Sequence, residues 1–187
     1  MRHLRHASIT PSPCRIFVRT VYPDMTLFPR PVVLAVDPGR DAAWAVFQGQ
    51  ALVAVGFREL PLPECLPLRS RVVVERPSIH GGTRNPASIV TLAIDLGMRV
   101  APYKVAGFSV EYVLPTTWKG NVKKDVCASR VKARLTEEEL EVVADLFKSK
   151  TDGKRSRLVV SKGKQHNVWD GIGIGLWAVG RFGRGVS

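Results

Sequence analysis

The sequence predicts an α/β fold whose mixed central sheet combines a three-stranded antiparallel meander with parallel strands and is flanked by helices. Residues 32–36 are an apolar run rich in Val, which is typical of a strand buried on both faces. Two more apolar runs, 42–47 and 51–57, follow after very short connections, as in an antiparallel meander. Two further strands are expected at 71–75 and 109–115, with a helix between them.

The helix between these two strands has a clear start signal. Asn85 suits the N-cap and Pro86 suits the first helical position. The helix is expected to run to about Ala101, with a kink or interruption at Gly97 and Pro102. Apolar residues at helical spacing predict a buried stripe, which consists of Ile89, Leu92, Ala93, Leu96 and Val100.

Three more helices are expected after residue 119. The first covers about 125–135, and a capping-box pattern at Thr136 and Glu139 begins the second, which runs toward Lys148. Residues 157–161 are expected to form a small strand or hairpin within a basic stretch. The last helix, 166–180, contains three Gly before its end, at 171, 173 and 175, and each costs about 1 kcal/mol relative to Ala. A helix that accepts this cost is expected to lie very close to the sheet.

The charge points to a polyanionic partner. The 187 residues include 28 Lys and Arg against 16 Asp and Glu, so the formal net charge is +12. Such an excess favours nucleic acid over a membrane surface, and a merely soluble basic protein is the alternative. The hydrophobic content of 45% is ordinary for a globular protein. No apolar run is long enough to span a membrane, so no membrane partner is expected.

Cysteine content and the first residues bear on compartment and domain limits. Cys14, Cys65 and Cys127 are odd in number and far apart in sequence, which disfavours a disulfide framework and favours the cytoplasm of a bacterium or a phage-infected host. Residues 1–30 are basic and rich in Pro, and we expect a flexible extension there, with Met25 as the true start. An organelle-targeting signal is the alternative. A single domain is expected at 31–183.

Two predicted strands each end in a carboxylate. Asp37 ends the first strand, directly before the turn-forming Pro38-Gly39, and Glu75 ends the strand at 71–75. For Asp37 alone, capping of the turn is an equally good interpretation. Two strands that each deliver an acid at the end are harder to explain in that way, and they suggest a site for a divalent metal.

The last helix adds a third carboxylate, Asp170. His166 and Asn167 precede it by four and three positions, so the three residues share a face of the helix. Carboxylates with a few neutral ligands and no thiolate suit Mg²⁺ or Mn²⁺. Two such ions could activate a water and stabilise a leaving oxygen in phosphodiester hydrolysis. For His166, capping of the helix is the alternative.

Four motifs follow one another along the chain: Val-Asp37-Pro-Gly, Val-Val-Glu75, Pro-Thr-Thr-Trp-Lys119-Gly and His166-x-x-x-Asp170. In this order they resemble the RuvC-type Holliday junction resolvases of the ribonuclease H-like fold, and the Gly-rich ending is similar to the phage-encoded branch. The resemblance runs from about residue 32 to 180. It implies a homodimeric endonuclease that cuts four-way DNA junctions in recombination and repair. It also implies dependence on Mg²⁺, with Mn²⁺ as a substitute and two ions expected.

The resemblance also implies roles for individual residues. Asp37, Glu75 and Asp170 match metal ligands, and His166 and Asn167 are added as candidate ligands, with His166 also a candidate catalytic residue. Asn167 stands where cellular members usually carry an acid or His, and its carbonyl oxygen can still bind a metal. Lys119 and one of Lys123 or Lys124 match basic residues that contact the scissile phosphate region, and Lys119 is also a candidate catalytic residue. Basic residues expected to contact DNA are Arg84, Lys119, Lys123, Lys124, Lys162 and Lys164.

Two other functions stay open on the sequence alone. One is a nuclease of the same fold that acts on the RNA strand of an RNA–DNA hybrid. The other is a junction-binding protein with impaired catalysis, which the Asn at position 167 leaves open. The helix at 85–101 is the candidate dimer interface by resemblance, although its apolar residues fit an ordinary core equally well.

Overall fold

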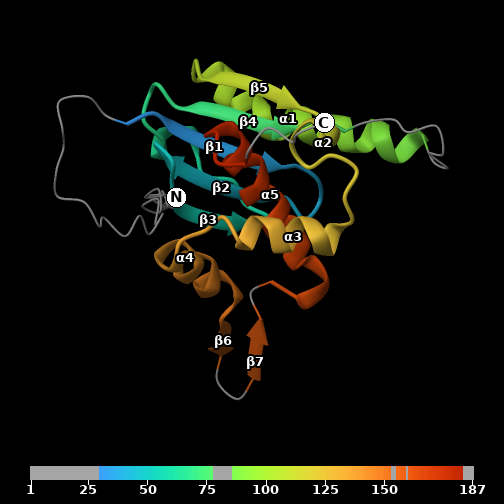
Figure 1. The fold of residues 1–187 in the computed structure, drawn as a ribbon. Helices are drawn as coiled ribbons and strands as arrows, with labels where there is room; N and C mark the ends of the chain where they lie inside the picture. The colour runs from blue at the N-terminus through green and yellow to red at the C-terminus, as the bar shows by residue number, and fades with distance from the viewer. Residues whose placement is uncertain (1–29, 78–85, 153–154, 159, 183–187) are drawn as a thin grey trace, which may run out of the picture.

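The computed structural model describes residues 30–77, 86–152, 155–158 and 160–182. Its centre is a five-stranded sheet in the order β3-β2-β1-β4-β5. The first three strands form the antiparallel meander, and the last two run parallel to β1. The predicted mixed sheet, an antiparallel meander joined to parallel strands, is therefore confirmed (Figure 1). The strands are β1 (Val32–Asp37), β2 (Ala43–Gln48), β3 (Ala51–Phe57), β4 (Arg71–Glu75) and β5 (Ser109–Val113).

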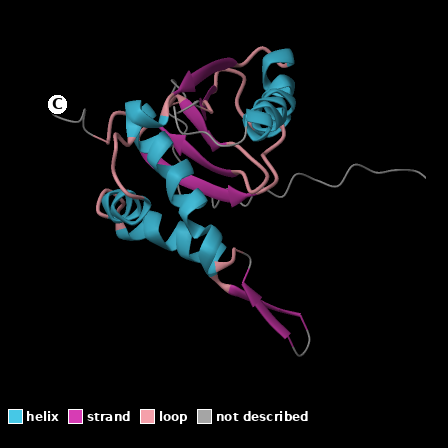
Figure 2. Ribbon diagram, turned by 90° about the vertical axis from the view of Figure 1, so that its right-hand side faces the viewer, coloured by secondary structure: helices cyan, strands magenta, loops and turns pink. Residues whose placement is uncertain are grey.

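Helices cover both faces of the sheet. In Figures 1 and 2, α5 crosses one face together with α3 and α4, and α1 covers the other. A small hairpin, β6–β7, projects away from the rest of the domain. The helices are α1 (Pro86–Val105), α2 (Pro115–Trp118), α3 (Lys124–Lys132), α4 (Glu137–Phe147) and α5 (Gln165–Ala178), the 3₁₀ turns are η1 (Pro63–Cys65) and η2 (Lys162–Lys164), and the hairpin strands are β6 (Ser149–Asp152) and β7 (Arg155–Leu158).

The unbroken apolar run of β1 is explained by burial on both sides. Val33 and Ala35 belong to the core beneath α5, whereas Leu34 and Val36 belong to the core beneath α1. Because successive side chains of a strand point to opposite faces, a strand with a core on each face has no polar side.

Helix α1 differs from the prediction in two respects. It continues through Gly97 and Pro102 to Val105, so the expected interruption is wrong. Val100 and Tyr103 are buried, and this packing outweighs the poor helix propensity of the proline between them. In the predicted stripe, Leu96 and Val100 are buried but Ala93 is exposed. The first turns of α1 extend beyond the sheet, so they have no core to face (Figure 1).

The structure also bears on the predicted capping box and the predicted hairpin. The capping box is confirmed, since Thr136 accepts from the Glu139 backbone N–H at 3.3 Å and the Glu139 carboxylate accepts from the Thr136 N–H at 3.0 Å. The hairpin lies earlier in the chain than the expected 157–161. The expected extension before residue 30 lies outside the described residues.

Two cysteines, Cys65 and Cys127, lie among the described residues. Cys65 is disulfide-bonded. Cys127 has a free, buried thiol. None of the helices within the described residues is long and apolar enough to cross a membrane.

The glycines of α5 allow the close approach that the sequence predicts. A Cβ built on Gly171 would lie 3.3 Å from the Ala43 backbone of β2. A Cβ on Gly175 would lie 2.1 Å from the ring of Phe47, closer than real Cβ atoms come to a neighbour. The helix therefore rests on the sheet where side chains would otherwise hold it away.

Candidate functional site

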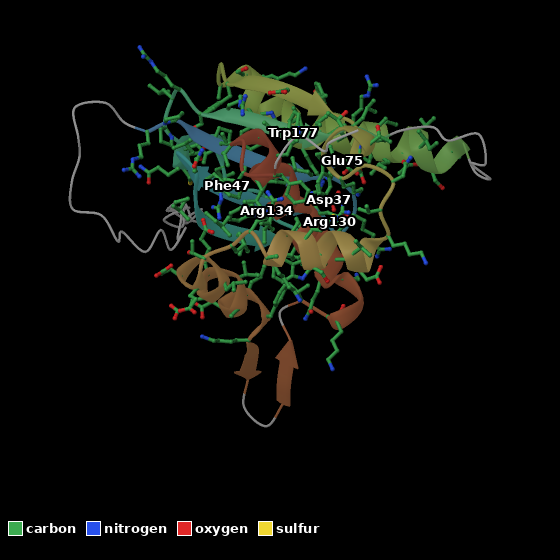
Figure 3. The ribbon with its side chains drawn as sticks, viewed as in Figure 1. Asp37, Phe47, Glu75, Arg130, Arg134 and Trp177 are labelled. Carbon is green, nitrogen blue, oxygen red and sulfur yellow. The ribbon has the colours of Figure 1, made fainter. Side chains whose placement is uncertain are left out.

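Asp37 and Glu75 lie together because their strands are parallel neighbours. Val36 of β1 is paired with Val74 of β4, so the next residue of each strand emerges at the same edge of the sheet. Figure 3 shows the two carboxylates at this end of the sheet. Gly39, with a φ of 130°, turns the chain away directly after β1.

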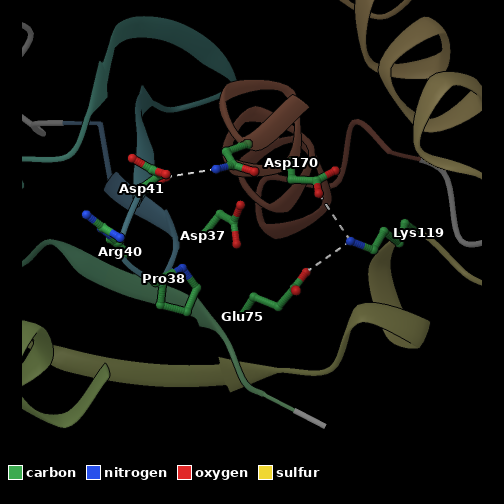
Figure 4. A pocket seen from close by; sticks show the side chains of 9 residues that line it. Asp37, Pro38, Arg40, Asp41, Glu75, Lys119 and Asp170 are labelled. Carbon is green, nitrogen blue, oxygen red and sulfur yellow. Dashed lines mark hydrogen bonds and ion pairs between the residues drawn. The ribbon is translucent and has the colours of Figure 1, made fainter. Parts of the chain in front are cut away.

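Asp170 reaches the same place from α5. Its side chain is nearly buried, and the residue as a whole is 7% exposed. The three carboxylates line one pocket of about 420 Å³ (Figure 4). The other residues that line it are Pro38, Gly39, Arg40, Asp41, Lys119 and Asn167.

Lys119 links two of the carboxylates. It follows α2, and its Nζ lies 3.5 Å from Glu75 Oε2 and 3.3 Å from Asp170 Oδ2 (Figure 4). Burial disfavours its charged form, but the carboxylates of Glu75 and Asp170, with Asp37 adding to them, raise the pKa of Lys119. The ammonium therefore supplies a fixed positive charge within the acidic pocket.

Glu75 is the carboxylate most affected by its surroundings. Burial raises its pKa, and the negative charge of Asp170 adds to this effect. The Lys119 ammonium and the Trp118 indole N–H act in the opposite direction without cancelling it. This acid is poorly hydrated, so a cation that approaches it gains from a strong local field.

Asn167 and His166, which were predicted together, are placed differently. Asn167 lines the pocket and its Nδ2 donates to the carbonyl oxygen of Asp41 at 3.0 Å. His166 is half-buried on the same helix but is not among the residues that line the pocket. Its assignment as a ligand or catalytic residue stays a prediction.

The basic residues expected to contact DNA are spread over several elements. Lys123 is exposed at the N-cap of α3, and Lys162 is exposed in η2. Lys164 pairs with Asp41 at 2.6 Å, and Lys119 lies in the pocket. Lys124 is the first residue of α3, and Arg84 lies outside the described residues. The structure therefore brings only Lys119 of the described set into the pocket.

Three residues of the site were not anticipated from the sequence. Arg40 and Asp41 line the pocket in the turn after β1, directly behind the Asp-Pro-Gly motif. Interaction with Lys164, supported by Arg58, lowers the pKa of Asp41 against the opposing effect of burial. Trp118 lies next to Lys119 and donates its indole N–H to Glu75. Their positions in the sequence were the signal that could have identified them, since Arg40 and Asp41 follow the Asp-Pro-Gly motif and Trp118 directly precedes Lys119.

The residues present suit a hard divalent cation in chemical type. The carboxylates of Asp37, Asp41, Glu75 and Asp170 line a single pocket together with the Asn167 amide, and oxygen donors of this kind bind Mg²⁺ and Mn²⁺. Among the described residues, no group of three or more His, Cys, Asp or Glu stands close enough to hold a metal ion as arranged. The Lys119 ammonium between Glu75 and Asp170 shows that this arrangement accommodates a positive charge.

Comparisons with known proteins give a likeness of fold. A structure of T. thermophilus RuvC in complex with a Holliday junction substrate has a TM-score of 0.46 and 18% identity, covering 83% of this chain and 98% of that one. A second Thermus thermophilus RuvC structure has a TM-score of 0.47 and 18% identity, with 82% and 97% covered. The similarity is one of fold. No protein family matches the sequence, and no curated protein matches it.

Proposed function

We propose that the chain is a metal-dependent, structure-selective DNA endonuclease that cuts four-way or other branched junctions by phosphodiester hydrolysis. The observation that carries the proposal is the delivery of Asp37, Glu75 and Asp170 from three elements to one pocket, with Lys119 among them. An apolar-walled ligand site would not gather three acids, whereas a cation site for phosphate chemistry requires them.

The metal ligands in this proposal are the three carboxylates, with the side-chain oxygen of Asn167 as a further donor. The hydrogen bond from Asn167 Nδ2 to Asp41 fixes the amide and leaves its oxygen to serve the pocket. Bound divalent ions would activate a water and stabilise the leaving oxygen. The Lys119 ammonium would donate to a phosphate oxygen, and Arg40, exposed at the pocket, would hold a neighbouring phosphate.

The charge of the chain supports a nucleic-acid substrate. The chain carries a net charge of +12, and the exposed Lys123 and Lys162 lie outside the pocket, where they can contact the phosphates that flank a cleavage site. The four sequence motifs, which resemble those of RuvC-type resolvases, support a junction as the substrate. A homodimer built on α1 would place two pockets on one junction and is part of the proposal.

The proposal predicts cleavage of a synthetic four-way DNA junction in Mg²⁺, with linear duplex and an RNA–DNA hybrid as comparison substrates. Asp37→Asn is expected to abolish cleavage, because it removes one of the carboxylate charges that bind the metal. Junction binding in Ca²⁺ is expected to change little, because phosphate contacts dominate binding. Gel electrophoresis of labelled arms measures the cuts, and fluorescence anisotropy measures binding.

Other results of this experiment would contradict the proposal in different ways. Cleavage of the hybrid alone would make the protein a ribonuclease of the same fold. Tight junction binding without cleavage in Mg²⁺ or Mn²⁺ would indicate a junction-binding protein with a disabled site. Loss of both binding and cleavage in Asp37→Asn would contradict the separation between the pocket and the DNA-binding surface.

A further inference from the structure

The indole of Trp118 connects the buried core to the pocket. Trp118 is 3% exposed and ends α2, directly before Lys119. Its Nε1 donates a hydrogen bond to Glu75 Oε2 at 2.7 Å, within the ideal range for this bond. The Lys119 ammonium approaches the same oxygen at 3.5 Å. Two consecutive residues therefore hold one oxygen of Glu75.

The ring of Trp118 is itself held between two elements. A Cβ built on Gly173 of α5 would lie 2.4 Å from Trp118 Cζ3, so the ring fills the space left by that glycine. Phe182 packs edge-on against the ring, with centroids 6.2 Å apart and an interplanar angle of 70°. With its ring fixed in this way, the indole N–H has little freedom to leave Glu75.

Gly173 lies three residues after Asp170, about one helical turn away. The contact between the Trp118 ring and Gly173 therefore sets the distance from α5 to α2 close to the point where Asp170 enters the pocket. The same indole then fixes Glu75 on β4. One side chain thus positions two carboxylates that come from different elements.

We infer that Trp118 is a positioning residue for the metal-binding pocket: it orients the Glu75 carboxylate by holding Oε2, and it sets the spacing between Glu75 and Asp170. The inference rests on the proposed function, because it assumes that the pocket binds such an ion. Partners that orient metal ligands through hydrogen bonds typically change metal affinity 10- to 100-fold when removed. A tryptophan that only filled the core would affect stability alone.

Trp44 offers a matched control. It also fills the space of a glycine, since a Cβ on Gly56 would lie 2.1 Å from Trp44 Cζ2, and its Nε1 donates to the Glu59 carbonyl oxygen at 2.6 Å. It packs on the core beneath α1, on the other face of the sheet, and does not line the pocket. Trp44→Phe and Trp118→Phe thus remove the same group, but only the second removes it from a pocket carboxylate.

The test is direct Mn²⁺ binding by electron paramagnetic resonance of the free ion, with thermal unfolding in EDTA measured in parallel. Wild-type protein and Trp44→Phe are expected to bind alike, and Asp37→Asn identifies the signal that belongs to the pocket. Trp118→Phe is expected to bind Mn²⁺ roughly tenfold more weakly. Junction binding in Ca²⁺ is expected to stay unchanged.

The outcomes distinguish failure of the inference about Trp118 from failure of the proposed function. Unchanged Mn²⁺ affinity in a folded Trp118→Phe protein overturns the inference and leaves the proposed function intact. Wild-type Mn²⁺ binding that is absent or insensitive to Asp37→Asn overturns both. If Trp118→Phe does not fold, benzothienylalanine at position 118 takes its place, since it keeps the ring shape and lacks only the N–H. Equal affinity in that protein would likewise overturn the inference.

Discussion

The side chain of Glu75 lies under opposing electrostatic influences. Burial and the nearby Asp170 disfavour its charge, while Lys119 and Trp118 favour it, and the net effect is a raised pKa. A raised pKa means that the folded chain holds this proton to a higher pH than the unfolded chain does. The contribution of Glu75 to the free energy of unfolding therefore falls as pH rises from its unfolded pKa through its folded pKa.

Glu75→Gln is accordingly expected to raise the melting temperature of the metal-free protein at neutral pH, because the neutral amide removes a poorly hydrated charge. Below the unfolded pKa of Glu, about 4.3, the difference from wild type should vanish, since both side chains are then neutral. Differential scanning calorimetry in EDTA across this pH range measures it. A lower melting temperature at neutral pH would mean that the ion pair with Lys119 outweighs burial.

At the scale of single residues, the sequence motifs located the pocket but not its full lining. Asp37, Glu75, Asp170 and Lys119 were all predicted and all line it. His166 was also predicted but does not line the pocket. Helical spacing gives the angle between two side chains of a helix, but it does not say which face of the helix is turned toward the pocket. That choice depends on how α5 packs, and packing is not visible in spacing.

The sequence of helix α5 favours close packing against the sheet over high helix propensity. Its glycines remove side chains where Ala43, Trp118 and Phe47 stand. The cost in helix propensity is offset by burial against the sheet, since residues 168–176 are all buried.

Gly175→Ala is expected to lower the free energy of unfolding by about 1–3 kcal/mol, because the new methyl would overlap the Phe47 ring inside a packed core. Gly97→Ala in α1 is the matched control. Its Cβ would meet nothing within 4 Å, so it is expected to stabilise the helix by up to about 1 kcal/mol. Urea denaturation measures both free energies of unfolding. If Gly175→Ala and Gly97→Ala changed the free energy of unfolding by the same amount, the proposed role of the α5 glycines would be refuted.

Elements with a local signal were predicted well. The meander, the capping box of α4 and the last helix all carry their signal within a few residues, through hydrophobic pattern or cap chemistry. The β6–β7 hairpin was placed too late in the sequence, because a basic, polar segment has no apolar alternation to fix its register. The continuity of α1 through Pro102 also had no local signal, since it depends on the core that packs on either side.

For the molecule as a whole, α1 leaves a stripe of apolar side chains in solvent. Val90 and Ile94 are each 58% exposed and Met98 is 70% exposed, and their spacing of four residues puts them on one face of the helix. Contiguous exposed apolar surface often marks a site of interaction with a partner, and this row suits such a surface. In the proposed dimer, a second copy of the chain covers it.

Ile94→Asp is expected to shift the protein toward a monomer at micromolar concentration, because it places a charge at the centre of the proposed interface. Val126→Asp on α3, where the apolar side chain is also exposed, is the control for a general effect of added charge. Sedimentation velocity distinguishes the two. A wild-type protein that is already monomeric would contradict a dimer built on α1.

The pocket unites residues that stand far apart in the chain, since Asp37 lies on the first strand and Asp170 on the last helix. Contacts between such distant segments raise the contact order, and the entropy of closing so long a loop makes them slow to form. We therefore expect the hairpins of the meander to appear early in folding and Asp170 to arrive late. A partly folded chain would then hold a sheet without a complete set of pocket acids, so that, under the proposed function, DNA cleavage would arise only with the finished fold.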